Sequence, residues 1–242
     1  MELFADTINE IRDFLARKDN TKSWPVNPDT NWPSGQSRNV VLGNDMAVEL
    51  GNPRMESVSC ILWTEKTDTI RNNYITLIGP DLPESRGACL PFGKIVLLEV
   101  SGFDEENTYE RYREMELVRY GLDLKGYMLR AVSQYKREWC RISHEALDGG
   151  FCIDVLASKQ IRNFNKINYV AGVECIFVTS SPQDVRELAA ITHDTTRIIA
   201  AMNKMAQELN FDCETCEYQD VCYEATDLKR MREAYRKKIS DG

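Results

Sequence analysis

The chain has 242 residues, of which 43% are hydrophobic and 28% charged, so it is a globular protein long enough to bury a sizeable core. Its formal net charge of −8 argues against a general nucleic-acid binder, because such proteins hold phosphates with a surplus of cations. No apolar run approaches the ~18 residues that span a bilayer, and the first residues lack a signal-peptide or transit-peptide pattern. We therefore expect a cytoplasmic protein without membrane partners, whose eight cysteines stay reduced.

At the start of the chain, apolar residues that recur at helical spacing predict an amphipathic helix over residues 2–17. A polar stretch with three prolines follows, and it predicts an irregular connector that Trp24 and Trp32 pin to the body. We assign residues 1–37 to this helix and its connector.

The body of the chain, residues 38–210, is predicted to be an α+β domain. Six runs rich in apolar and β-branched residues are typical of strands, and several are apolar on both faces, which indicates a sheet partly covered on both sides. The strands first cluster and then alternate with helices, which favours a mixed sheet over a regular doubly wound one. A cysteine cluster and a charged helix occupy residues 211–242. The predicted strands are 57–65, 74–80, 94–102, 126–132, 138–143 and 173–180, and the predicted helices are 104–121, 154–166, 182–209 and 224–238.

Several stretches of this body are more particular than generic strands and loops. In chain order they read "VLGNDMAVELGNPRMESVSCILWTE", "ITLIGPDL", "LPFGKIVLLEVSGFDEENTYERYREMEL", "GYMLRAVSQYKREWCRISHEAL" and "VECIFVTSSPQDVREL". They resemble the middle portion of the acetyl-CoA synthase subunit of carbon monoxide dehydrogenase/acetyl-CoA synthase. The likeness covers roughly residues 39–222, and its most specific pieces are the Gly and Pro positions of "ELGNP" and "LIGPD".

The resemblance implies a chemistry. In that family a methyl group from a corrinoid protein, carbon monoxide and coenzyme A are joined into acetyl-CoA at a nickel–iron–sulfur cluster, in the domain that follows the matched portion. A Cys-Gly-Cys element binds the nickel there, and this sequence contains none. We therefore assign no catalytic residue and do not expect the complete reaction from this chain alone. The implied partners are subunits of carbon monoxide dehydrogenase or the corrinoid protein.

Three cysteines near the C-terminus, Cys213, Cys216 and Cys222, are the candidate metal ligands. A Cys-x2-Cys spacing brings two sulfurs to one side of a turn, and a third cysteine soon after can close the same face. The resemblance favours an iron–sulfur cluster, because the cluster cysteines of the family begin in this part of the chain. Zinc is the alternative, and a remnant loop with reduced thiols is the third interpretation.

The fourth ligand of such a site stays open between a non-cysteine group and the remaining cysteines. Cys60 and Cys175 lie in apolar strand runs and are predicted to be core residues. Cys140 and Cys152 are expected in more polar surroundings, and Cys89 is the last candidate.

A basic stretch with aromatic residues is the second candidate site. In a chain this acidic, such clustering suits the phosphates of coenzyme A, with an aromatic ring stacked on the adenine. The resemblance supports this interpretation, because the matched middle domain is implicated in coenzyme A binding. The alternative is a solvated strand edge whose cations prevent edge-to-edge pairing. The candidate cofactor-binding residues are Arg130, Lys136, Arg137, Trp139 and Arg141.

Three hypotheses for the function follow. The preferred one is an accessory, acetyl-CoA synthase-like protein of anaerobic carbon monoxide and acetyl-CoA metabolism that binds an iron–sulfur cluster and coenzyme A. The second is one chain of a split acetyl-CoA synthase whose nickel domain is a separate polypeptide. The third is a non-enzymatic interaction protein with structural zinc or free thiols.

Overall fold

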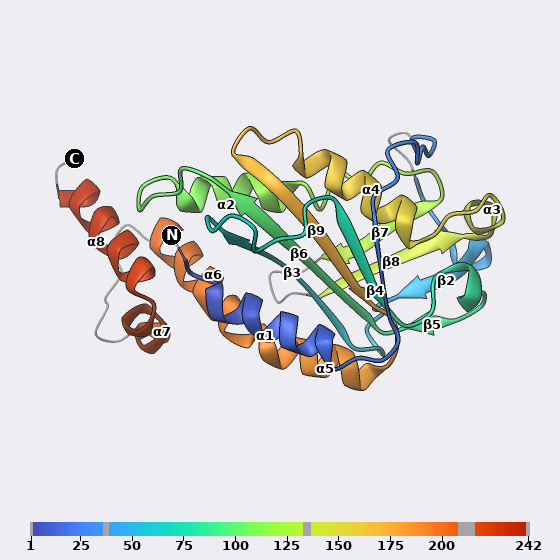
Figure 1. The fold of residues 1–242 in the computed structure, drawn as a ribbon, viewed down its shortest axis with the longest axis horizontal. Helices are drawn as coiled ribbons and strands as arrows, with labels where there is room; N and C mark the ends of the chain where they lie inside the picture. Colours follow the sequence, from blue (N-terminus) through green and yellow to red (C-terminus); the bar gives the residue numbers. More distant parts are fainter. Residues whose placement is uncertain (1, 36–38, 133–136, 208–215, 241–242) are drawn as a thin grey trace.

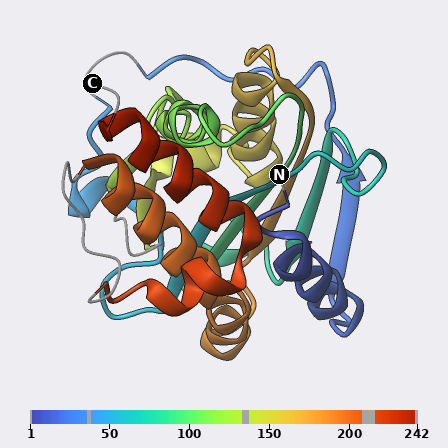
Figure 2. The same ribbon diagram turned by 90° about the vertical axis from the view of Figure 1, so that its left-hand side faces the viewer.

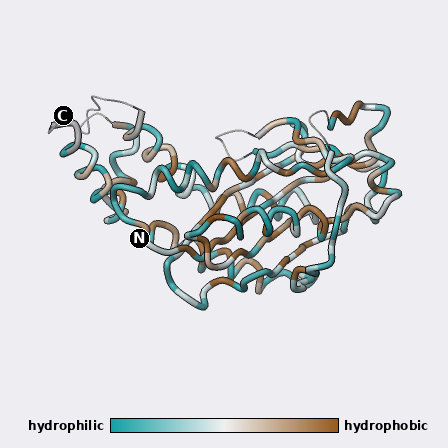
Figure 3. The backbone as a smooth tube through the Cα atoms, turned by 90° about the horizontal axis from the view of Figure 1, so that it is seen from above, coloured by the Kyte–Doolittle hydropathy of each residue, from teal (hydrophilic) through white to brown (hydrophobic). Residues whose placement is uncertain are grey.

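The computed structural model describes the chain except for residues 1, 36–38, 133–136, 208–215 and 241–242. It confirms the predicted α+β class, because two mixed sheets lie among helices (Figure 1). Hydrophobic residues concentrate along the strands at the centre, whereas the last helix is largely hydrophilic (Figure 3).

The larger sheet consists, in order across the sheet, of β1 (Thr21–Pro25), β4 (Tyr74–Ile78), β9 (Val170–Val178), β6 (Phe92–Val100) and β3 (Ser57–Thr64). β3 is parallel to β6 and β4 is parallel to β9, whereas β6 and β9 run antiparallel to each other. β6 and β9 are buried along most of their length, as their apolar, β-branched sequences predict.

The smaller sheet consists, in order, of β5 (Cys89–Leu90), β2 (Met46–Leu50), β8 (Glu138–Ser143) and β7 (Tyr127–Val132). Burial alternates along β8, so that Glu138 and Cys140 face inward while Trp139 and Arg141 lie on the outer face. The inner face packs on the larger sheet, where Lys94 Nζ of β6 donates to Glu138 Oε1 at 2.5 Å.

Helices cover both faces of the larger sheet. α1 (Ala5–Ala16) and α5 (Pro182–Ile191) run side by side over one face, and α4 (Ile153–Phe164) packs on β9 and β4 from the other (Figure 1). Two further helices are α2 (Thr108–Leu117) and α3 (His144–Asp148), and α3 packs on β2 and β8 of the smaller sheet.

Three helices form a separate group at one end of the molecule (Figures 1 and 2). They are α6 (His193–Gln207), α7 (Gln219–Glu224) and α8 (Thr226–Ser240), and each contacts the other two. Among the described helices, none combines the length and apolar composition needed to cross a membrane.

The elements differ from the sequence-based expectations in two respects. The stretch expected to be an irregular connector contains β1, and the short strands β2 and β5 were not predicted, because each needs a partner strand from elsewhere in the chain to form. The single helix predicted over residues 182–209 is wrong. It is divided at Thr192 into α5 and α6. The Thr192 hydroxyl donates to the carbonyl of Leu188, which also accepts from the Thr192 amide, and such back-bonding often bends helices.

Candidate functional site

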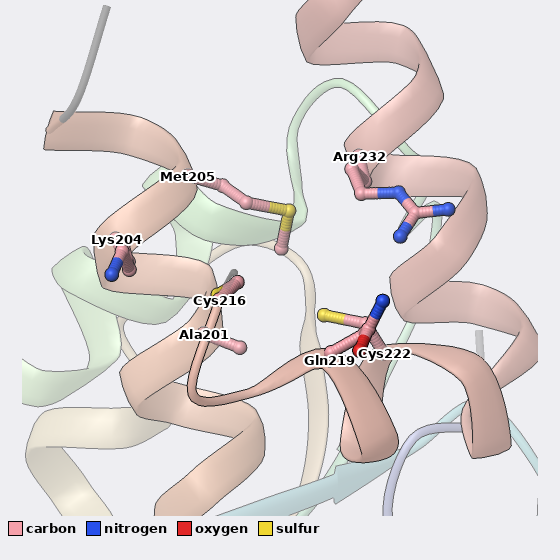
Figure 4. A pocket seen from close by; sticks show the side chains of 7 residues that line it. All are labelled: Ala201, Lys204, Met205, Cys216, Gln219, Cys222 and Arg232. Atoms are coloured by element: carbon pink, nitrogen blue, oxygen red, sulfur yellow. The ribbon is translucent and has the colours of Figure 1, made fainter. Parts of the chain in front are cut away.

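Two of the three candidate cysteine ligands come together in the C-terminal helix group. Cys216, which precedes α7, and Cys222, within α7, both line one pocket between α6, α7 and α8 (Figure 4). Cys222 is 5% exposed and Cys216 is half-buried. Cys213 lies outside the described residues, so its predicted role as a ligand stays a prediction.

The walls of this pocket are cationic and apolar. Lys204 of α6 and Arg232 of α8 flank it, and the described lining residues include no carboxylate. Nearby cations stabilise thiolates and anionic metal clusters. The other lining residues are Ala201, Met205 and Gln219 (Figure 4).

The described residues supply only part of a metal site. No group of three His, Cys, Asp or Glu side chains suited to one metal ion occurs among them. Cys216 and Cys222 provide two of the four ligands that structural zinc or a cysteine-bound iron–sulfur cluster requires. The room beside the thiols is about 20 Å³, which suits a single ion, so a cluster requires the pocket to widen.

The other cysteines lie elsewhere in the fold, and none of them lines this pocket. Cys60 and Cys175 are buried in strands, as predicted, and burial raises the pKa of Cys175 to about 12. Cys140 faces inward from β8 and is buried, but beside polar groups as expected: burial followed by the nearby Glu138 carboxylate raises its pKa. Such protonated, enclosed thiols are unreactive.

Three of the candidate cofactor-binding residues also come together, on the outer face of the smaller sheet. The guanidinium carbon of Arg130 lies 4.8 Å from the ring centroid of Trp139, and that of Arg141 lies 5.6 Å away. Both distances are within the range of cation–π contacts. The pairing of β7 with β8 therefore brings two cations to one aromatic ring.

Glu49 of β2 orients this group from the neighbouring strand. Its Oε1 accepts from Arg141 Nε at 2.6 Å and from Trp139 Nε1 at 2.9 Å, and its Oε2 accepts from Asn52 at 2.9 Å. Burial alone raises the pKa of Glu49, but these donors together with the charge of Arg141 bring it below its ordinary value. Glu49 thus stays ionised and holds Arg141 in place. Cys89, also next to this carboxylate at 3.6 Å, is exposed.

The other two candidate cofactor-binding residues, Lys136 and Arg137, are not shown to be part of this group. Arg137 Nη2 donates to the carbonyl of Met55 at 2.7 Å, across the loop that follows β2, and Lys136 lies outside the described residues. β8 is an inner strand of its sheet, so the expected strand edge applies to Arg130 on β7 but not to Trp139 or Arg141.

Sequence reasoning missed the residues that reach these sites from other elements. Glu49 lies in "ELGNP", and nothing in the local sequence marks it, because its partners depend on the pairing of β2 with β8. Lys204 and Arg232 lie on two different helices, and nothing in the local sequence distinguishes them from other cations of the chain.

Comparison with known proteins agrees with the resemblance. The profile of a family described as the CO dehydrogenase/acetyl-CoA synthase complex beta subunit matches residues 36–183, more than half of the chain. An Archaeoglobus fulgidus protein named acetyl-CoA decarbonylase/synthase complex subunit beta is 28% identical over 140 residues, 56% of this chain and 25% of the relative. Its namesake from Methanothermobacter thermautotrophicus is 29% identical over 113 residues, 46% of this chain and 23% of the relative.

The match covers most of the α+β body of this chain but only part of the relatives. The chain spans about a quarter of the length of these curated relatives. The family match includes Glu49, Arg130, Trp139 and Arg141 but ends at residue 183, ahead of the cysteine cluster. Over the α+β body, profile, relatives and motif order agree, and the chain belongs to the family of the beta subunit of the CO dehydrogenase/acetyl-CoA synthase complex.

Proposed function

We propose that this chain is an accessory, acetyl-CoA synthase-type subunit that holds a metal centre in its C-terminal helix group. The observation that carries the proposal is the convergence of Cys216 and Cys222 on one cationic pocket. Cys213 would be the third ligand, and an iron–sulfur cluster is the proposed occupant, with zinc as the alternative. Such a cluster supplies electron transfer, whereas zinc would act as a structural clasp.

The residues around the pocket suit an anionic occupant. Cys222 comes from the buried side of α7, so a metal bound to it would also fasten α7 against α6 and α8. Lys204 and Arg232 would offset the negative charge of thiolates, which lowers the cost of keeping them deprotonated.

The test is anaerobic purification followed by measurement of visible absorbance and of iron, sulfide, zinc and nickel content. We expect thiolate-to-iron charge-transfer absorbance with matching iron and sulfide. The variant with Cys213→Ser and Cys216→Ser should lose the metal, because too few thiolates remain. Cys89→Ser, which removes an exposed thiol of the smaller sheet, is the matched control and should keep it. A metal-free wild-type protein after reconstitution would contradict the proposal, and zinc alone would assign the structural role.

A second proposed function, binding of coenzyme A, rests on a different observation: the two guanidinium groups at Trp139. An indole can stack on adenine, and guanidinium groups bind phosphates in bidentate fashion. Arg141 is already held by Glu49 through Nε, so its guanidinium group is positioned beside Trp139 before any ligand binds.

Calorimetric titration with coenzyme A tests this second function. Trp139→Ala should weaken binding by ~1–3 kcal/mol, the usual contribution of one stacked base. Arg130→Ala should weaken it through the lost phosphate contact, while Lys22→Ala, an exposed cation of β1, should leave affinity unchanged. Absence of any binding heat, or equal effects of the Lys22 and Arg130 variants, would reject the site.

We also propose protein partners, and the support for them is the family. The names of both relatives describe a subunit of a multi-subunit complex. We infer that this chain associates with subunits of carbon monoxide dehydrogenase or a corrinoid protein, either as an accessory subunit or as one chain of a split synthase. A neighbouring gene that encodes a Cys-Gly-Cys polypeptide would favour the split synthase.

A further inference from the structure

A groove with two arginines lies where the larger sheet ends at β1, beside the C-terminal half of α1. Its volume is about 340 Å³. α1, β1, β4 and the loop before β4 all contribute side chains to it, and no carboxylate is among its described lining residues. In Figure 1, the chain leaves α1 and turns back into β1 along this edge. The polar lining residues are Arg12, Thr21, Ser23, Thr69, Arg71 and Thr76.

The two guanidinium groups leave a surplus of one positive charge at the groove. Both bind Glu174 of β9, whose side chain is fully buried. Among the described residues, no other carboxylate pairs with Arg12 or Arg71, so one negative charge balances only one of the two cations. The remaining charge is accessible to a ligand, because 28% of the Arg12 side chain and 46% of the Arg71 side chain are exposed.

Glu174 also holds Arg71 in a fixed orientation. Nε and Nη2 of Arg71 donate to Glu174 Oε1 at 3.2 and 3.0 Å, and its guanidinium carbon lies 5.2 Å from the ring centroid of Tyr74. Nη1 makes no hydrogen bond to any residue that the structure describes, so two N–H donors stay unused. A guanidinium group that is already fixed loses little conformational entropy when it binds an anion.

A chain of hydroxyl groups adds a further donor. Arg71 Nη2 donates to Thr76 Oγ1 at 2.9 Å, and Thr76 Oγ1 lies 2.9 Å from Ser23 Oγ. Thr76 is fully buried, and Ser23 Oγ is the one acceptor for its hydrogen in the described part of the chain, so this hydrogen goes to Ser23. The hydrogen of Ser23 is then left for another acceptor. Because Ser23 is exposed, it can donate this hydrogen to a ligand.

Thr69 provides one more donor, from the loop before β4. Its carbonyl accepts from Arg12 Nη2 at 3.0 Å, but its hydroxyl has no partner among the described residues. The hydroxyl of Thr21 does not add to this set, because it donates to the carbonyl of Lys18 at 2.8 Å. The groove therefore combines surplus positive charge with donors from Arg71, Ser23 and Thr69, which favours an anion over a neutral ligand.

We propose that this groove binds the phosphate group of a small phosphate monoester. Phosphate oxygens accept from guanidinium and hydroxyl groups, and several oxygens can meet donors that come from different elements of the fold. Leu15 and Ala16 of α1 line the same groove and give the organic part of the ester an apolar wall. The volume of about 340 Å³ exceeds what a free phosphate ion fills and is within the range of small-molecule sites.

This groove is separate from the proposed metal and coenzyme A sites. Arg12 and Ser23 precede the residues that match the family profile, which begin at residue 36. The family therefore does not assign a ligand to this groove. Phosphate binding here requires neither the metal at the cysteines nor coenzyme A at Trp139, so it can be tested independently of both.

Calorimetric titration with inorganic phosphate, at an ionic strength held constant with sodium chloride, is the first test. We expect saturable binding at this site. Arg71→Gln should weaken the binding by about tenfold or more, the usual effect of losing a hydrogen bond between charged groups. Lys22→Gln is the matched control, because it removes the same charge from the neighbouring position of β1, whose side chain lies on the other face of the strand. It should leave the affinity almost unchanged.

Two further variants keep both arginines and Glu174, so the ion pairs that support the fold stay intact. Ser23→Ala and Thr69→Val each remove one hydroxyl donor, and each should weaken phosphate binding several-fold while circular dichroism shows an unchanged fold. Arg130→Ala changes the proposed coenzyme A site and should bind phosphate as the wild type does. Loss of phosphate binding in Arg130→Ala would assign the phosphate to that site and overturn the groove.

The choice of ligand separates the ester from other anions. Phenyl phosphate should bind more tightly than inorganic phosphate, because its ring can contact the apolar wall, and acetate should not compete with either. Tighter binding of inorganic phosphate would overturn the ester, and equal competition by acetate would overturn the choice of phosphate. Absence of saturable binding, equal losses in Arg71→Gln and Lys22→Gln, or full affinity in both hydroxyl variants would overturn the site itself.

Discussion

Lys94 and Glu138 form an ion pair between the two sheets, and both side chains are only 1% exposed. Ser59 Oγ of β3 donates to the second oxygen of Glu138 at 2.9 Å, so three strands meet at this carboxylate. A buried pair of this kind gains little net stability over apolar residues, but it specifies alignment, because a charge without its partner is costly in the core. The pair therefore helps to fix how β8 lies on β6 and β3.

Removal of one partner should cost far more than removal of both. We predict that Lys94→Met lowers the free energy of unfolding by about 3–5 kcal/mol, because the Glu138 carboxylate is left buried and unpaired. Lys94→Met combined with Glu138→Met should recover most of this loss, since both charges are gone. Urea unfolding of the single and double variants measures the difference. Equal losses of unfolding free energy in both would show that lost packing, not an unpaired charge, destabilises the single variant.

Two glycines explain why "ELGNP" and "LIGPD" are specific. Gly51 has φ +62°, and a Cβ there would lie 2.2 Å from the carbonyl oxygen of Glu138. Gly79 has φ +108°, and its Cβ would lie 2.4 Å from the amide of Ser180. At both places the backbone of a distant segment approaches closely, so only glycine fits. Gly51 therefore allows the backbone at Glu138 to approach β2 closely. Gly79 in the same way allows the close approach of Ser180, just before α5.

At the scale of elements, α1 is held to the sheet by a buried carboxylate. Glu174 of β9 is fully buried, and Arg12 of α1 binds both its oxygens, at 2.8 and 2.6 Å. Arg71 binds the same carboxylate from the loop before β4, at 3.0 Å through Nη2. Burial by itself raises the pKa of Glu174, but Arg12 and then Arg71 lower it below its ordinary value.

This shift has a definite pH dependence. Because the folded-state pKa lies below the ordinary value of 4.5, the stabilisation is present above that pH and is lost as pH falls through the folded pKa. We predict that Glu174→Gln costs about 2–4 kcal/mol at neutral pH, less than for a wholly buried pair because both arginines reach solvent. The variant should also lose less stability than the wild type between pH 5 and pH 3, as measured by urea unfolding across this range.

The ion pairs of Lys18, just after the C-terminal end of α1, provide the control. Lys18 pairs with Asp184 and Glu187 of α5, each at 2.7 Å, but Glu187 is 36% exposed. Glu187→Gln should therefore cost less than about 1 kcal/mol, as is usual for solvated pairs. Similar losses for Glu187→Gln and Glu174→Gln would contradict the role assigned to burial.

At the scale of the whole molecule, regular strands and helices could largely be predicted from periodicity. The strands at 57–65, 94–102 and 138–143 and the helices at 154–166 and 224–238 occur within a few residues of the predicted positions. The short strands β1, β2 and β5 could not, because their stability comes from pairing with distant segments. The break between α5 and α6 at Thr192 was also missed, because no Gly or Pro marks it in the sequence.

The residues of the candidate sites also differ in whether the local sequence could identify them. Local sequence identified Cys216, Cys222, Trp139 and Arg141 as chemically notable, because residue type and spacing are local properties. It did not identify Glu49 as the residue that orients Arg141. A buried carboxylate acquires its partners only when β2 pairs with β8.

By itself, the sequence determined the α+β class, the family and the residue types available for chemistry, since composition, periodicity and motif order are all encoded along the chain. The tertiary structure alone decided which of these residues meet. It set two cations at Trp139, enclosed Cys140 in the core, and brought Cys216 and Cys222 to one pocket. The physical reason is that charge and hydrogen-bond energies fall steeply with distance, and distances between remote segments exist only once the sheets and helices have packed.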